Sequence, residues 1–357
     1  MAEADDISGV IEEDVLRLVE AIYQESADKG ERAAANILVM AKKGEEERRA
    51  FVDAGVIPAL CSMCTRENEA RTQAKAALAL GALCSNYAIT LDDNQIYVHQ
   101  EAQSEALSQG AVTLLVPVLT SWQPDAQAAA AEALANLAFQ NSDARKQMQT
   151  SEAGKALVNL LHSENVDVHR AVLCALRVYA VEGRYALEID SRGCLPPTIK
   201  LLNSDRHDVV ARSLRLLWVL SITDPIKAKI AKEKEGKLLK EVVKHLRSTQ
   251  HPIKAAAMQL VRTICTVEDY RAEVFALGGH TDVIAMISNK DDELLVLNAL
   301  GCLTMMCSVE SRKNAIASVN DIMESVSRLR TTSKGGKKAS QAVQDRAKGL
   351  LDILGGA

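Results

Sequence analysis

Two cysteines in a C-x-x-C pattern, Cys61 and Cys64, come nearest to residues whose types and spacing could do chemistry. Such a pair could supply two of the four ligands that a structural zinc site needs. No second cysteine pair or histidine cluster at a suitable spacing completes the set, and the seven histidines are scattered along the chain. Both cysteines also occupy apolar positions of a helical pattern. We therefore predict buried core thiols and no metal site.

Other motifs of catalysis or nucleotide binding are also missing from the sequence. The paired glycines of the segment SKGGKK (residues 333–338) lack the preceding strand and following helix of a phosphate loop. Neither a nucleophile elbow nor an H-E-x-x-H pattern occurs. We predict a protein that is not an enzyme, with no catalytic residues and no cofactor.

The composition indicates a helical protein with a core of aliphatic side chains. Hydrophobic residues make up 48% of the 357 residues, yet aromatic residues make up only 3%. The net charge of −5 is modest for this length and gives no general attraction to nucleic acid or membranes. The acidic start has no signal-peptide pattern, and no apolar run approaches the roughly 20 residues that span a bilayer. We expect free thiols, no membrane insertion, no nucleic acid partner and a cytoplasmic location, with the nucleus as the alternative.

A repeated pattern runs through most of the chain. Each copy has a short segment that ends near a glycine, then an apolar helix, a polar turn and a helix rich in Ala and Leu, as in EALSQGAVTLLVPVLTSWQPD followed by AQAAAAEALANLAFQN. The turn glycines are Gly55, Gly110, Gly154, Gly193, Gly236 and Gly279. Four of their five spacings lie near 42 residues, and the longer first spacing predicts an insertion at residues 87–101. We expect each glycine to take the left-handed conformation between a first and a second helix.

This pattern resembles the armadillo repeat family, with copies of "aGxIpxLvxLL" and "xxAaxALxNLA" over about residues 10–357. The resemblance implies an all-α fold, a right-handed superhelix (α-solenoid) of three-helix repeats. We predict an acidic segment at residues 1–10, a capping half repeat at 11–43, about seven repeats at 44–330, and a polar loop with a capping helix at 331–357.

In the armadillo family the third helices line a concave groove, and two positions four residues apart point into it. Aligning "xALxNLA" predicts a groove across repeats two to five. The candidate partner-binding residues are Glu132, Asn136, Arg170, Arg215, Gln259 and Thr263. Only Asn136 matches the Trp and Asn ladder of the nuclear-import adaptors, which argues against an importin-alpha role. Apolar residues between the polar ones leave an amphipathic helix as an alternative ligand.

Basic residues gather in two segments. Residues 225–254 carry nine Lys or Arg and three Glu, and residues 328–348 carry seven Lys or Arg and one Asp. The predicted basic stripe is Lys237, Lys240, Lys244, Arg247 and Lys254. It could receive an acidic partner segment, or it could simply be a solvated helix face.

The function that follows is a scaffold or adaptor that binds a partner protein or peptide along the groove. One alternative is a regulator, an exchange factor or co-chaperone, of a small GTPase, Hsp70 or myosin. Another is the substrate-binding subunit of a ubiquitin ligase, which is weakened because no RING-like or U-box-like segment precedes the repeats. No single motif identifies the partner.

Overall fold

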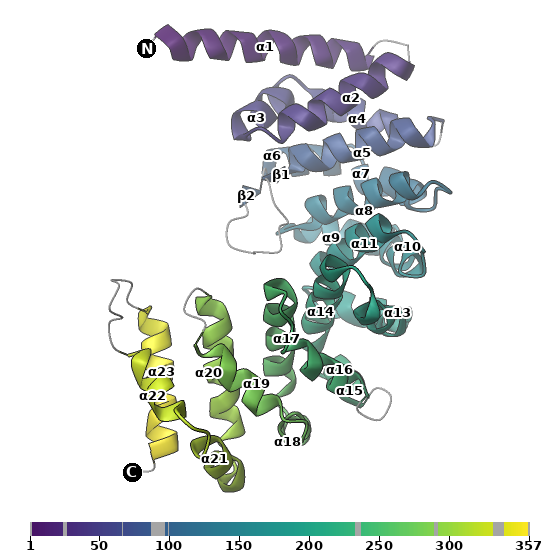
Figure 1. The fold of residues 1–357 in the computed structure, drawn as a ribbon. Coiled ribbons are helices and arrows are strands. Elements are labelled where there is room, and N and C mark those ends of the chain that lie inside the picture. Colours follow the sequence, from purple (N-terminus) through teal and green to yellow (C-terminus); the bar gives the residue numbers. More distant parts are fainter. Residues whose placement is uncertain are drawn as a thin grey trace. The chain divides into compact units, whose positions relative to one another are not determined.

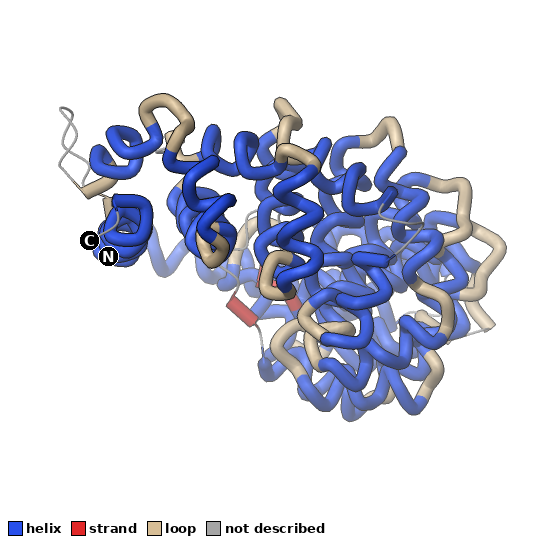
Figure 2. The backbone as a smooth tube through the Cα atoms, turned by 90° about the horizontal axis from the view of Figure 1, so that it is seen from below, coloured by secondary structure: helices blue, strands red, loops and turns tan. Residues whose placement is uncertain are grey.

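The computed structural model describes residues 2–23, 27–65, 67–86, 97–98, 100–232, 237–288, 292–330 and 339–355. The chain divides into two compact units, residues 1–197 and 198–357, and each is described by itself. Helices, blue in Figure 2, make up most of the described residues. Among these helices, none combines the length and the apolar character needed to cross a lipid bilayer.

Repeat two shows how the sequence builds the three-helix element. The first helix, α6 (Gln100–Ser108), ends just before Gly110, whose left-handed backbone (φ 73°) turns the chain into α7 (Ala111–Leu119). The third helix, α8 (Pro124–Ala138), begins with a proline, whose missing N–H costs nothing at that position because a first-turn N–H has no partner within the helix. The turn residues therefore set the helix boundaries.

Unit one contains an N-terminal helix pair, three complete repeats and the start of a fourth. Its remaining helices are α1 (Ala2–Tyr23), α2 (Ala27–Ala41), α3 (Glu45–Asp53), α4 (Val56–Met63), α5 (Ala70–Cys84), α9 (Ser142–Thr150), α10 (Ala153–Leu160), α11 (Val166–Tyr179) and α12 (Gly183–Ser191). The third helices α5, α8 and α11 stack in order, and α2 packs on α5 (Figure 1). α1 continues through the boundary predicted at residue 10.

Unit two begins within α13 (Leu195–Lys200), the second helix of repeat four. Its other helices are the 3₁₀ helix η1 (Leu201–Asn203), α14 (His207–Ser221), α15 (Asp224–Lys232), α16 (Lys237–His245), α17 (His251–Ile264), α18 (Glu268–Ala276), α19 (Gly279–Met286), α20 (Glu293–Met306), α21 (Glu310–Ala317), α22 (Ile322–Arg328) and α23 (Gln341–Gly355). The third helices α14, α17 and α20 stack in order, and α23 packs on α20, α21 and α22 as the third helix of a seventh repeat (Figure 1). The helix predicted to cap the chain therefore completes a repeat.

Small residues let the third helices approach one another closely. A Cβ atom added to Gly81 on α5 would lie only 3.0 Å from the Cα atom of Ala133 on α8. Ala133 is itself fully buried, as are Ala129 and Ala130 on the same helix. The shortage of aromatic residues thus reflects a core made of closely packed helix backbones.

Arginines of two first helices bind the C-terminal ends of the helices that precede them. Nη1 of Arg48 donates to the carbonyl of Ala41 at 2.8 Å, and Nη1 of Arg145 donates to that of Ala138 at 2.8 Å. Carbonyls in the last turn of a helix have no partner within it, so these guanidinium groups satisfy them. The same contact recurs in two repeats of unit one and joins successive helices there.

The turn glycines behave as predicted in three repeats. Gly55, Gly110 and Gly193 all have left-handed backbones, with φ of 71°, 73° and 85°. The prediction for Gly154 is wrong, because Glu152 takes the left-handed conformation (φ 58°) and Gly154 lies inside α10.

In repeat six the prediction is off by one residue. Gly278 is the left-handed residue (φ 80°), whereas Gly279 is the first residue of α19. The predicted turn at Gly236 lies outside the described residues.

The predicted insertion at residues 87–101 lies largely outside the described residues. Around it, the two-residue strands β1 (Ser85–Asn86) and β2 (Tyr97–Val98) form an antiparallel pair, red in Figure 2. Such a short pair is a local closure of the two ends of the insertion, and the described parts of the chain are otherwise helical or turn.

Candidate protein-binding surface

Each third helix turns one strip of side chains away from the core. On α8, Asp125, Ala128 and Glu132 are exposed or half-buried, whereas most residues between them are buried. Their spacing of three or four residues puts them on one helix face. On α17 the same strip includes Gln259 and Thr263, both half-buried. Stacked third helices therefore give each unit a row of positions that reach solvent, several of them polar, here called the third-helix row.

In unit one, the predicted residues Glu132, Asn136 and Arg170 differ in how far they reach solvent. Glu132 is exposed, but Asn136 is only 7% exposed and its side-chain amide lies over Gly81. Arg170 is half-buried and forms an ion pair with Asp167 on its own helix at 3.0 Å. Of the three residues, Glu132 is therefore the most accessible to a ligand.

In unit two, the predicted residues are Arg215 on α14 and Gln259 and Thr263 on α17. Arg215 is 8% exposed, so its guanidinium group is mostly covered. The hydroxyl of Thr263 donates to the carbonyl of Gln259 at 3.0 Å, which leaves it as an acceptor toward a ligand. The structure thus places the two α17 residues at the surface and Arg215 beneath it.

The predicted basic stripe lies mainly on a second helix. Lys237, Lys240 and Lys244 are exposed on α16, and Lys254 is half-buried near the start of α17. Apolar residues of α16 face the core, so the lysines occupy its solvent side. The stripe is therefore separate from the third-helix row, apart from the α17 lysine.

Two members of the stripe are neutralised within the chain. Lys244 pairs with Glu241 at 2.9 Å. Nε of Arg247 donates to both carboxylate oxygens of Asp282, at 2.8 and 3.0 Å, and this contact raises the pKa of Arg247. These contacts reduce the charge available to an acidic partner.

Sequence reasoning missed a pair of arginines on the third-helix row. Nη1 of Arg262 on α17 donates to Oδ1 of Asn298 on α20 at 2.9 Å. Nη1 of Arg346 on α23 donates to the main-chain carbonyl of Leu297 at 2.9 Å. Arg346 belongs to the basic segment 328–348, and that charge excess is the signal that could have pointed to it.

Residues 117–355 match the family model for the ARM repeat region of plant U-box proteins. The chain belongs to this family. The matched residues include Glu132, Asn136 and Gln259. The match confirms the predicted all-α solenoid of armadillo repeats. No curated protein matches the chain.

Several solved structures have the same armadillo fold. An engineered protein from the Northeast Structural Genomics Consortium is 25% identical, with a TM-score of 0.63 over 71% of this chain and 97% of that one. The designed armadillo repeat protein YIII(Dq)4CqI is 18% identical, with a TM-score of 0.60 over 70% and 99%. Another designed armadillo repeat protein, in complex with the peptide (KR)4, is 18% identical, with a TM-score of 0.58 over 70% and 99%.

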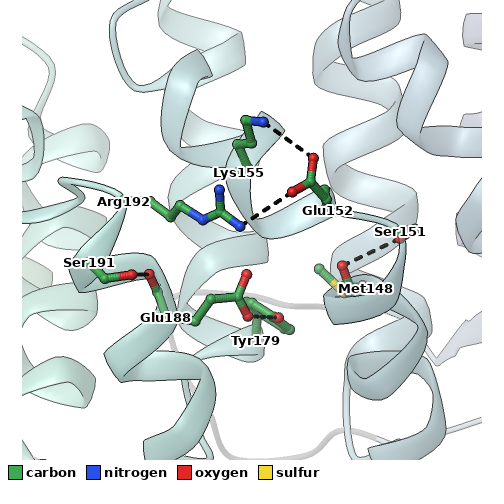
Figure 3. Close-up of polar contacts among 8 residues, drawn as sticks. All are labelled: Met148, Ser151, Glu152, Lys155, Tyr179, Glu188, Ser191 and Arg192. Atoms are coloured by element: carbon green, nitrogen blue, oxygen red, sulfur yellow. Dashed lines mark hydrogen bonds and ion pairs between the residues drawn. The ribbon is translucent and has the colours of Figure 1, made fainter.

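A polar cluster between armadillo repeats three and four is structural in character (Figure 3). The hydroxyl of Tyr179 donates to Oε2 of Glu188 at 2.5 Å, and burial together with this bond raises the pKa of Tyr179. Glu152 pairs with Lys155 at 3.2 Å and with Arg192 at 3.4 Å. The partners come from α10, α11, α12 and their turns, so the cluster joins two repeats.

The cysteines of the armadillo repeats are all free and buried. This confirms the prediction of core thiols for Cys61 and Cys64, which lie on and directly after α4. Burial raises the pKa of Cys61 to about 12. Within the described residues, no group of three or more His, Cys, Asp or Glu side chains is placed to hold a metal ion.

Proposed function

We propose that the chain is a non-enzymatic scaffold whose third-helix row holds a segment of a partner protein. The observation that carries the proposal is the row of each unit: in unit one Glu132 on α8 is exposed, and in unit two Gln259 and Thr263 on α17 are half-buried at the surface of stacked helices. Stacked repeats present such side chains at regular intervals of about 10 Å, the usual distance between packed helices. An extended or helical segment can contact several repeats at once.

A designed armadillo repeat protein of the same fold has been solved with a bound peptide, which supports a peptide or protein as the ligand class. The eight buried free thiols suit a reducing compartment, and we propose the cytoplasm. The alternative roles as a regulator of a small GTPase, Hsp70 or myosin stay predictions, because no contact in the described residues favours one of them.

A second candidate function is substrate binding for ubiquitin ligation. The match to the ARM repeat region of plant U-box proteins favours it. In this case the captured partner would be a substrate, so its ubiquitylation in cells would fall when the chain is depleted. A scaffold with no link to ubiquitin would leave the modification unchanged.

Site-specific photocrosslinking tests where the partner binds. A photoreactive amino acid placed at Glu132 or at Gln259 should crosslink a partner first identified by affinity purification and mass spectrometry. The same group at Lys146, exposed on the first helix α9, is the matched control and should give no crosslink. A fourth variant carries the photoreactive group at Lys240 on α16. If only this variant crosslinks the partner, the partner binds the basic stripe and the proposal is overturned.

A further inference from the structure

Two guanidinium groups converge on one point of the third-helix row in unit two. A Cβ atom built on Gly301 of α20 would lie 3.3 Å from Nη1 of Arg346 and 3.4 Å from Nε of Arg262. The arginines come from the neighbouring third helices α23 and α17, so they reach over α20 from both sides. Gly301 lies eight residues after the first residue of α20, the same place that Gln259 has on α17.

No carboxylate among the described residues pairs with Arg262 or Arg346. Each makes one hydrogen bond to a neutral oxygen, that of Asn298 for Arg262 and that of Leu297 for Arg346. Elsewhere in the same unit, Arg247 is matched by Asp282, and Arg312 by Glu268. Two positive groups held side by side repel each other, so an anion bound between them would remove this repulsion.

We propose that Arg262 and Arg346 bind the carboxylate of an Asp or Glu side chain in the partner segment. The proposal rests on the scaffold function above and names the chemistry of its ligand. A guanidinium group has five N–H donors and takes a carboxylate in a two-point contact. Since each arginine uses one donor within the chain, donors remain on both for the two carboxylate oxygens.

The neighbouring residues orient the arginines and leave room for the ligand. Asn298 is buried, 4% exposed, and its side-chain oxygen fixes Arg262 against α20. Gly301 has no side chain to fill the space between the guanidinium groups, and even a methyl group there would press on both. The site is therefore shaped before the ligand arrives, which reduces the entropy lost on binding.

Fluorescence anisotropy with a labelled peptide of four Glu-Ala repeats tests the site on the full chain. We expect binding at low ionic strength, weaker binding as salt rises, and no binding of the matching Gln-Ala peptide. Arg346→Gln should weaken binding about 10-fold or more, since a charge-assisted hydrogen bond typically contributes about 10-fold to 100-fold in affinity. Arg346 is exposed, so the variant keeps its fold.

Lys348→Gln is the matched control, because it removes the same charge from an exposed position of α23 two residues away, on another helix face. It should change affinity less than about 3-fold, the range of a purely long-range charge effect. Gly301→Ala keeps every charge and should also weaken binding. Equal losses in Arg346→Gln and Lys348→Gln, or tighter binding of a single-stranded oligonucleotide than of the peptide, would overturn the site.

The wild-type result separates this inference from the scaffold proposal. If the Glu-Ala peptide fails to bind while crosslinks form at Glu132 and Gln259, the scaffold stands and the acidic-ligand site is wrong. If neither occurs, both are wrong.

Discussion

Gln103 of α6 donates a hydrogen bond from Nε2 to the main-chain carbonyl of Asn136 on α8, at 2.9 Å. The same nitrogen lies 3.2 Å from the carbonyl of Phe139, and its side-chain oxygen accepts from Nδ2 of Asn141 at 3.1 Å. The side chain is 1% exposed. One buried amide thus donates to two main-chain carbonyls at the end of α8 and contacts the turn into α9. These hydrogen bonds hold the backbone of the predicted groove residue Asn136 in place.

Replacing this amide by a hydrocarbon of similar size should destabilise unit one. Gln103→Leu leaves the carbonyls of Asn136 and Phe139 without their donor in a buried site, and we expect the free energy of unfolding to fall by about 2–3 kcal/mol. Urea unfolding followed by far-UV circular dichroism measures the change. Gln109→Leu, at an exposed position after the same helix, should stay within about 0.5 kcal/mol of the wild type. Similar losses in both variants would contradict the role of Gln103.

The repeat pattern is sufficient to predict the three-helix fold, but it does not predict which residue of each turn has the left-handed backbone. Gly110 is a glycine because its backbone is left-handed, and the spacing alone identified it. Gly154 fits the same spacing for another reason: a Cβ atom there would lie 2.9 Å from Cε1 of Tyr179. Sequence periodicity cannot distinguish a glycine needed for its φ angle from one needed for space, so the left-handed Glu152 was missed.

The repeat register predicts which helices carry the candidate surface, but not which of its side chains reach solvent. The register predicts equivalent positions for Gln259 and Arg215, yet Gln259 is half-buried and Arg215 is 8% exposed, because burial depends on the neighbouring repeats. The alignment of repeat positions does not predict Arg262 and Arg346, because their long side chains reach Gly301 from the two adjacent helices.

The space around two helical glycines predicts opposite effects when each is replaced by alanine. Gly81→Ala puts a Cβ atom 3.0 Å from the backbone of Ala133, and overpacking of about 1–3 kcal/mol outweighs the gain in helix propensity of about 1 kcal/mol. Gly349→Ala in α23 meets nothing within 4 Å, so it should stabilise by up to about 1 kcal/mol. Thermal unfolding should show a lower midpoint for the first and an equal or higher one for the second. A stabilising Gly81→Ala would mean that the two helices are farther apart.

Two stacked tyrosines, with ring centroids 4.7 Å apart, offer a matched pair of substitutions. Tyr179→Phe removes the donor to the Glu188 carboxylate and should lower the free energy of unfolding by about 1.5–3 kcal/mol. The hydroxyl of Tyr185 is buried and has no hydrogen-bond partner among the described residues. Tyr185→Phe should therefore be neutral or stabilising, because it removes a buried hydroxyl that gains nothing. Urea midpoints of the two variants decide the matter, and a larger loss in Tyr185→Phe would refute the arrangement.

The buried thiols should make stability fall at alkaline pH. Burial raises the pKa of Cys61 from 9.0 to about 12, so the unfolded chain ionises this thiol first as the pH rises. Below pH 9 the thiol is neutral in both states and does not lower the free energy of unfolding. Between about pH 9 and pH 12 its ionisation in the unfolded chain lowers the free energy of unfolding by about 1.4 kcal/mol per pH unit. Urea unfolding between pH 8 and pH 11 should give a shallower alkaline decline for Cys61→Ala than for the wild type, whatever the variant costs at pH 8.

Thiol labelling gives an independent measurement on the same residues. At pH 8 the folded protein should react slowly with a thiol reagent at all eight cysteines, since each is buried and the pKa of Cys61, Cys64, Cys84 and Cys307 is raised. In denaturant all eight should react at once, because the thiols then have their ordinary pKa and full access to solvent. Rapid labelling of Cys61 or Cys64 in the folded protein would show instead that α4 opens readily or that this pair is an exposed, reactive site.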